Sequence, residues 1–104
     1  MIMLANAFSL QMVDLTKGTS VDFVPVTKEE VAQSGCQSVI GHQDTANVLT
    51  SLLGVEVPMN RVSVRITPED TLYVAQVTGG RLPEGATTLP EGMSFAFIKA
   101  TIRQ

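Results

Sequence analysis

The chain has 104 residues and a mass of 11.1 kDa, which is enough for one compact domain and too little for two. Apolar residues make up 44% of it, so the chain has material for a core and is not intrinsically disordered. Seven basic and ten acidic side chains leave a net charge of −3. This excludes nonspecific binding to long nucleic acid, which needs many Lys or Arg contacts to phosphate. The composition still allows a polyanionic partner where the positive charge is local.

Single residues exclude further classes of protein. Cys36 is the only cysteine, so no disulfide forms within the chain, and we expect a reducing compartment with Cys36 as a buried structural thiol. His42 is the only histidine, and one His with one Cys cannot supply the ligands of a structural zinc site. Residues 1–6 lack the basic start of a signal peptide, and no apolar run approaches the ~20 residues that span a bilayer. We therefore expect a soluble, intracellular protein with no membrane partner.

The first part of the chain predicts two strands joined by a short helix. Residues 1–5 form an apolar run typical of a buried strand, and polar side chains follow it. Residues 10–15 are apolar at positions 10, 12, 13 and 15, which indicates a short helix. Residues 21–26 have the composition of a strand. Pro25 places this strand at an edge of the sheet or marks its end, because proline cannot donate a ladder hydrogen bond.

Two further helices are predicted in the middle of the chain. Residues 27–30 (TKEE) combine a hydroxyl cap with a glutamate three residues later, the signature of a helix start, and this helix stops at Ser34 and Gly35. The next helix begins near Asp44, places Ala46 and its leucines on one face, and ends at Gly54, where glycine suits the position after the last turn. His42 therefore lies at the entry to this helix.

The last part of the chain predicts three strands. Residues 61–66 alternate arginine or serine with valine or isoleucine, which is typical of a strand with one polar and one apolar face. Residues 72–77 are apolar on both faces, which indicates a central strand, and a turn-rich loop over 78–85 follows. Residues 95–102 close the fold as a strand. Together these elements predict a single α+β domain over residues 1–104, with about five strands in a mixed sheet flanked by two or three helices.

Several polar side chains lie where sheets and helices commonly place ligand sites. They are His42 at a helix start, Asn6 and Ser9 beyond a strand end, Arg61 and Arg65 on a polar strand face, and Arg81 and Glu84 in a glycine-rich loop. Each group also has a purely structural interpretation, as a helix cap, local turns, a solvated strand face or a hairpin turn. The pattern alone therefore indicates no more than an α+β domain.

Four motifs occur in the order and with the spacing found in one known family. They are residues 4–9 (LANAFS), 40–42 (IGH), 60–62 (NRV), and 72–77 with 81–85 (LYVAQV and RLPEG). Through them the chain resembles the viral anti-CRISPR ring nucleases of archaeal viruses and bacteriophages, whose relatives also occur in cellular type III CRISPR loci. The resemblance extends over roughly residues 2–85.

The resemblance implies a homodimer that binds cyclic tetra-adenylate, the second messenger of type III CRISPR systems. It implies cleavage without a metal ion or cofactor, by attack of a ribose 2′-hydroxyl on the adjacent phosphate. The products would be linear di-adenylates with a 2′,3′-cyclic phosphate, and their formation would silence the signal. The expected location is the cytoplasm of a prokaryotic cell, the host cytoplasm for a virus-encoded member.

The resemblance also implies roles for individual residues. His42 matches the catalytic histidine, as general acid to the leaving 5′-oxygen, and Glu84 matches a loop glutamate that assists catalysis. The ligand-contacting positions of the family fall on Asn6, Ser9, Gln11, Gly41, Arg61, Gln76 and Arg81. Gln11 stands where a relative has asparagine. Residues 87–92 depart further, because relatives have a helix there and this stretch, with a proline and a glycine, looks too short for one.

Two functions from different classes follow. The leading one is an enzyme that cleaves the ring, and the alternative is a module that sequesters or senses the ring without cutting it. His42 and Glu84 together favour the enzyme, because a pure binder needs neither a proton donor nor that glutamate. A DNA-binding or structural viral protein is disfavoured by the acidic balance of the chain.

Overall fold

The computed structural model describes residues 1–104 and contains one five-stranded mixed sheet with two α-helices. In chain order the elements are β1 (Ile2–Ala5), the 3₁₀ turn η1 (Leu10–Met12), β2 (Ser20–Pro25), α1 (Lys28–Gln33), β3 (Gln37–Ser38), α2 (Gln43–Leu53), β4 (Thr71–Thr78) and β5 (Ser94–Arg103). The strand order is β2-β5-β4-β1-β3. β1 runs parallel to β3 and β4, whereas β5 runs antiparallel to β4 and β2. The predicted α+β class is confirmed.

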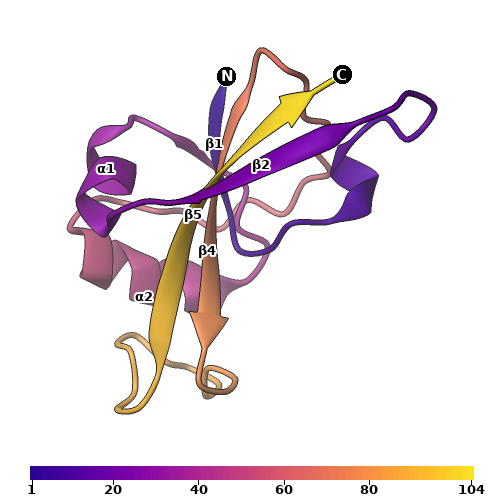
Figure 1. Cartoon of the computed structure of the whole chain (residues 1–104). Coiled ribbons are helices and arrows are strands. Elements are labelled where there is room, and N and C mark those ends of the chain that lie inside the picture. Colours follow the sequence, from indigo (N-terminus) through magenta and orange to yellow (C-terminus); the bar gives the residue numbers. More distant parts are fainter.

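The sheet has a core on each face. Along β1, Met3 and Ala5 belong to one apolar cluster and Leu4 to the other, because successive side chains of a strand point to opposite faces. The helices α1 and α2 lie on the Leu4 side, whereas the segment with η1 lies on the other side (Figure 1). β4 is buried on both faces and stands in the middle of the sheet, as its apolar sequence predicts. β2, with Pro25, lies at an edge as predicted.

Local sequence signals account for both helices. The Thr27 side chain accepts a hydrogen bond from the Glu30 backbone N–H at 3.1 Å and so caps α1. α2 ends at Gly54, whose φ of 72° is the left-handed conformation that glycine adopts without strain. None of the helices is long and apolar enough to cross a membrane.

The connection from β4 to β5, residues 79–93, contains no helix, in agreement with the prediction for residues 87–92. Gly79 lies at its base with a φ of 88°, and a Cβ atom there would lie 2.5 Å from the carbonyl oxygen of Gly92. Only glycine allows the two ends of the loop to approach so closely. The loop extends from the lower end of the molecule in Figure 1, opposite both termini.

The predicted strand over residues 61–66 is wrong. This segment has no regular secondary structure and packs on the sheet, and one backbone hydrogen bond, from Ile66 N–H to Met12 O at 2.6 Å, joins it to the η1 segment. Val64 and Ile66 pack on the core, whereas Val62 is 52% exposed. The alternation of polar and apolar residues therefore reflects a segment that packs one apolar face on the sheet. It has no neighbouring strand with which to form a ladder of hydrogen bonds. β3 has no sequence prediction, because two residues are too few to show a period.

The buried side chain of Tyr73 has a raised pKa. Its hydroxyl donates to Glu30 Oε2 at 2.8 Å, and Lys99 Nζ lies 3.9 Å from the same oxygen. Burial, and then the hydrogen bond to Glu30, raise the pKa of Tyr73 to about 12.

We therefore expect tyrosinate absorbance of the folded protein to rise near pH 12, against about pH 10 for the unfolded chain. Because the folded state holds its proton longer, the stabilisation is complete below about pH 10 and is lost as the pH rises through 12. Tyr73 is the only tyrosine, so the titration is unambiguous. In a Glu30→Gln variant the midpoint should fall part of the way, since burial is the larger cause. A native midpoint at pH 10 would contradict this account.

Candidate functional site

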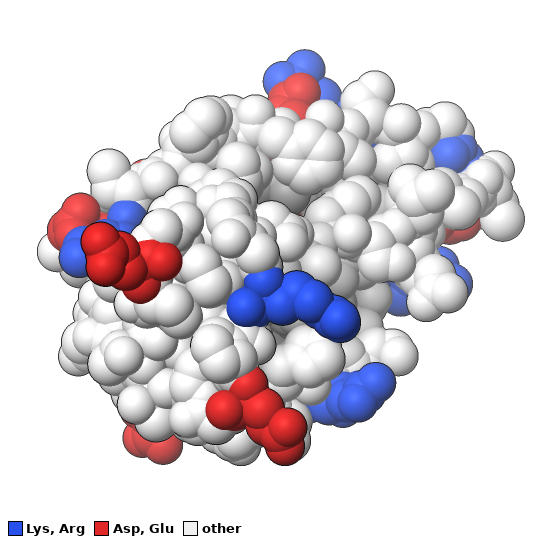
Figure 2. Space-filling view, turned by 90° about the horizontal axis from the view of Figure 1, so that it is seen from below, with Lys and Arg blue, Asp and Glu red and all other residues white.

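A hollow of about 440 Å³ lies where β1 and β4 end and α2 begins. Parallel strands of a sheet end at the same edge, where ligand sites commonly form. The hollow brings together four residues that are far apart in the sequence and that the family resemblance selects: Asn6, His42, Gln76 and Arg81. Figure 2 views the molecule from this end and shows basic side chains beside a hollow, with acidic side chains close by.

His42 is the residue immediately before α2, at the N-cap, but its side chain makes no capping hydrogen bond. Serine, threonine, aspartate and asparagine are preferred at this position because their side chains accept a hydrogen bond from the first turn. The exposed imidazole of His42 forms no ion pair or other hydrogen bond within the chain. It is therefore available to a ligand in the hollow.

Two contacts hold the chain at Gly41, the residue immediately before His42. Asn6 Oδ1, just beyond the end of β1, accepts a hydrogen bond from the Gly41 backbone N–H at 3.3 Å. A Cβ atom at Gly41 would lie 3.5 Å from Arg61 Cγ, so the aliphatic stem of Arg61 runs beside this glycine. Arg61 does not line the hollow, but its stem lies against Gly41, the residue that precedes His42.

The arginines near the hollow have no acidic partner. Ion pairs within the chain use the N-terminus, Lys99 and Arg103, and leave Arg61 and Arg81 unpaired. A free guanidinium is the side chain best suited to a planar, bidentate contact with phosphate or carboxylate. No group of three or more His, Cys, Asp or Glu side chains is arranged to hold a metal ion. The donors present suit an anionic ligand.

Other predicted residues lie outside this lining. Glu84 belongs to the β4–β5 loop, next to Gly85, and does not reach the hollow. Ser9 caps η1, where its Oγ accepts from the Gln11 N–H at 3.2 Å. Gln11 lines a separate hollow with Arg65 and Asp14, whose pKa is held below its usual range by hydrogen bonds from the Thr16 side chain and backbone. The ligand contacts of Ser9 and Gln11 stay predictions.

The structure adds lining residues that the sequence did not indicate. Asp44 and Thr45 come from the first turn of α2, and Phe95 comes from the start of β5. Acidic and hydroxyl residues are common in any first helical turn, so nothing in the pattern distinguished Asp44. Phe95 reaches the hollow only because β5 pairs with β4 next to Val77.

A family model described as STIV B116-like matches residues 2–98. The chain belongs to the STIV B116-like family. The solved structure of B116 of Sulfolobus turreted icosahedral virus is similar to this chain, with a TM-score of 0.71, 22% identity, and coverage of 96% of this chain and 97% of that one. At this identity the likeness shows the fold alone.

A second viral protein is also similar to this STIV B116-like chain. "Uncharacterized protein 26" of Sulfolobus islandicus filamentous virus is 40% identical over 48 residues, which are 46% of this chain and 40% of that protein. The chain thus matches less than half the length of that relative. Both matches are to proteins of viruses, which agrees with the viral part of the prediction, whereas the ring nuclease activity stays a prediction.

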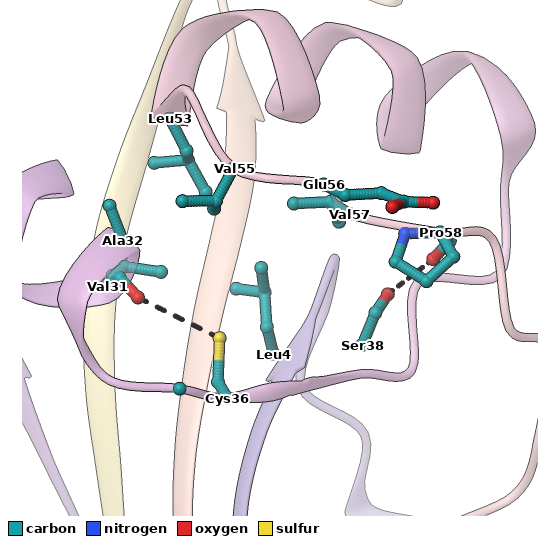
Figure 3. A pocket seen from close by; sticks show the side chains of 11 residues that line it. Leu4, Val31, Ala32, Cys36, Ser38, Leu53, Val55, Glu56, Val57 and Pro58 are labelled. Atoms are coloured by element: carbon teal, nitrogen blue, oxygen red, sulfur yellow. Dashed lines mark hydrogen bonds between the residues drawn. The ribbon is translucent and has the colours of Figure 1, made fainter.

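This STIV B116-like chain has another hollow, of about 280 Å³, between α1, the end of α2 and the segment after it (Figure 3). Its wall is mostly apolar, and Cys36 Sγ lies 3.9 Å from Val31 O. Ser38 Oγ donates to Pro58 O at 2.6 Å. Cys36 is half-buried, so the expectation of a buried thiol is corrected: the residue lines this hollow, which is not filled by other side chains. None of the predicted site residues lines this cavity.

Proposed function

We propose that this STIV B116-like chain is a metal-independent ring nuclease that binds cyclic tetra-adenylate at a homodimer interface and thereby switches off type III CRISPR signalling. The observation that carries the proposal is the convergence of His42, Arg81, Gln76 and Asn6 on one hollow. These residues come from four separate segments of the chain, and each matches a functional position of the ring nucleases. The position of His42 adds support. It occupies an N-cap without capping the helix, and residues that depart from such local preferences are expected at functional sites.

The proposed reaction uses a nucleophile from the substrate. A ribose 2′-hydroxyl loses its proton to solvent and attacks the neighbouring phosphorus, and the bond from phosphorus to the 5′-oxygen breaks. The leaving oxygen takes a proton from the His42 imidazolium, which is reprotonated from solvent. The new bond closes a 2′,3′-cyclic phosphate, and the other end carries a 5′-hydroxyl. Arg81 stabilises the charge that develops on the phosphoryl oxygens. Glu84 lies in the same loop but outside the lining of the hollow, and its assisting role is implied by the resemblance alone. Holding the 2′-oxygen in line with the leaving oxygen supplies much of the rate.

Two-fold symmetry explains how one histidine per chain cuts a ring in half. A cyclic tetra-adenylate ring and a C2 dimer can share an axis, so each subunit presents its His42 to one of two opposite phosphates. Arg61 and Arg81 are both unpaired, and a dimer doubles them to four guanidinium groups for four phosphates. The few basic residues of the chain are sufficient for a partner of this size.

The deciding experiment incubates the protein with radiolabelled cyclic tetra-adenylate in EDTA. We expect linear di-adenylate with a 2′,3′-cyclic phosphate. In the same assay Arg81→Ala should weaken ring binding by tenfold or more, since a charge-assisted contact is worth roughly 1.5–3 kcal/mol. Arg65→Ala is the matched control, because Arg65 is also unpaired but lies outside the hollow. A bound but intact ring would favour the sequestering module, and no binding at all would contradict both functions.

A further inference from the structure

The β4–β5 loop, residues 79–93, is joined to the rest of the chain by two hydrogen bonds from α2. Asp44 Oδ2 accepts from the Gly85 backbone N–H at 3.2 Å. About two turns further along the same face of α2, Ser51 Oγ donates to the Thr87 carbonyl oxygen at 3.0 Å. Other hydrogen bonds of the loop are local turns within it. A long connection without regular structure has many accessible conformations, and these two bonds restrict them.

The loop carries residues that the proposed reaction needs. Arg81 lines the hollow beside His42, and Glu84 immediately precedes the Gly85 amide that Asp44 binds. Asp44 itself follows His42 by two residues at the start of α2 and lines the same hollow. The Asp44 carboxylate therefore joins the start of α2, which holds His42, to the part of the loop that holds Glu84.

The negative charge of Asp44 has opposite effects with and without a phosphate ligand in the hollow. Asp44 adds a negative charge to the wall of a hollow whose other charged group is the Arg81 guanidinium. A negative charge beside a phosphate ligand is repulsive, although it also interacts favourably with the α2 N-terminus. The hydrogen bond from the Gly85 N–H needs an acceptor oxygen on residue 44 but does not need its negative charge.

Resting on the proposed function, we infer that Asp44 and Ser51 are positioning residues, which hold the β4–β5 loop so that Arg81 lines the hollow beside His42 and Glu84 stays close to the start of α2. Neither side chain takes part in the bond changes. Asp44→Ala removes the acceptor, whereas Asp44→Asn keeps an acceptor oxygen and removes the charge. Ser51→Ala breaks the second bond without altering the start of the helix.

The first measurement is made without ligand and is independent of activity. Amide exchange of Gly85 and backbone relaxation over residues 84–87 should show a loop released in Asp44→Ala and restored in Asp44→Asn. Ser51→Ala should release the part around Thr87. Gln43→Ala is the matched control, because Gln43 adjoins Asp44 in the same helical turn and its side chain bonds only Asn47. An equally ordered loop in wild type, Asp44→Ala and Ser51→Ala would overturn the inference.

The second measurement is cleavage of cyclic tetra-adenylate. Asp44→Ala should lower kcat by about 10- to 100-fold, the size expected when catalytic groups are displaced by about 1 Å. Asp44→Asn should recover most of that loss and bind the ring more tightly, because the repulsive charge is gone. A released loop with an unchanged kcat would overturn the positioning role. A wild-type protein that orders its loop through Asp44 and leaves the ring intact would overturn the proposed function and leave the tether standing.

Discussion

An alanine in place of His42 is expected to slow cleavage of cyclic tetra-adenylate by about 10²- to 10⁴-fold, the contribution of one general acid. The ring should still bind, because Asn6, Gln76 and Arg81 line the hollow independently of the imidazole. His42 is the only histidine, so no other imidazole can replace it as proton donor. Single-turnover rates give the chemical step, and gel-shift titration gives the affinity.

The control for this experiment is Gln43→Ala, one residue further along the same helix entry. Its side chain bonds only Asn47 and lines no part of the hollow, so its cleavage rate should be that of wild type. Equal rates for His42→Ala and wild type would remove the general acid from the mechanism. Loss of ring binding in His42→Ala would instead make His42 a ligand contact.

A dimer with one His42→Ala subunit separates the two cuts. Each subunit of a symmetric dimer serves one of two opposite phosphates, so the mixed dimer should open the ring once and accumulate linear tetra-adenylate. The mixed species can be isolated with two different affinity tags and analysed by the same labelled-ring assay. Release of di-adenylate at the normal rate would contradict the shared-axis arrangement.

The second large effect concerns stability. Leu49→Ala is expected to lower the free energy of unfolding by about 2–5 kcal/mol. Leu49 is 0% exposed on α2 and packs in the cluster that joins the helices to the sheet. Its truncation leaves a cavity that the surrounding residues fill only in part. For a domain with a total stability of about 5–15 kcal/mol this is a large fraction.

Urea denaturation followed by far-ultraviolet circular dichroism, at one protomer concentration, measures this loss. Leu15→Ala is the matched control, because Leu15 is 64% exposed, and its effect should stay within about 0.5 kcal/mol. Similar losses for the two leucines would mean that Leu49 does not belong to a close-packed core.

Much of the fold could be predicted where a local signal was sufficient. Thr27 marks the start of α1 and Gly54 the end of α2, because capping depends on residues within one turn. The central place of β4 followed from its two apolar faces. The strand predicted over residues 61–66 was wrong for the opposite reason. Alternating polar and apolar residues also suit a coil that lies on a sheet, and a strand needs a neighbouring strand for its backbone hydrogen bonds.

Part of the candidate site could also be predicted from the sequence. The family motifs selected His42, Asn6, Gln76 and Arg81, which the structure brings to one hollow. They did not indicate Asp44, whose bond to Gly85 spans 41 positions of the chain. Contacts of that separation depend on how β4, its loop and α2 pack together, and no local pattern records them.

The charge balance, −3 on 104 residues, follows from the sequence alone, and with it the expectation that long nucleic acid is not a nonspecific partner. Caps, turns and the apolar period of each element were likewise local properties. Only the tertiary structure decided that unpaired Arg81 and Arg61 lie near the sole histidine, and that α2 holds the loop beside it. The reason is physical: composition fixes how much charge a chain has, whereas strand pairing and packing fix where that charge converges.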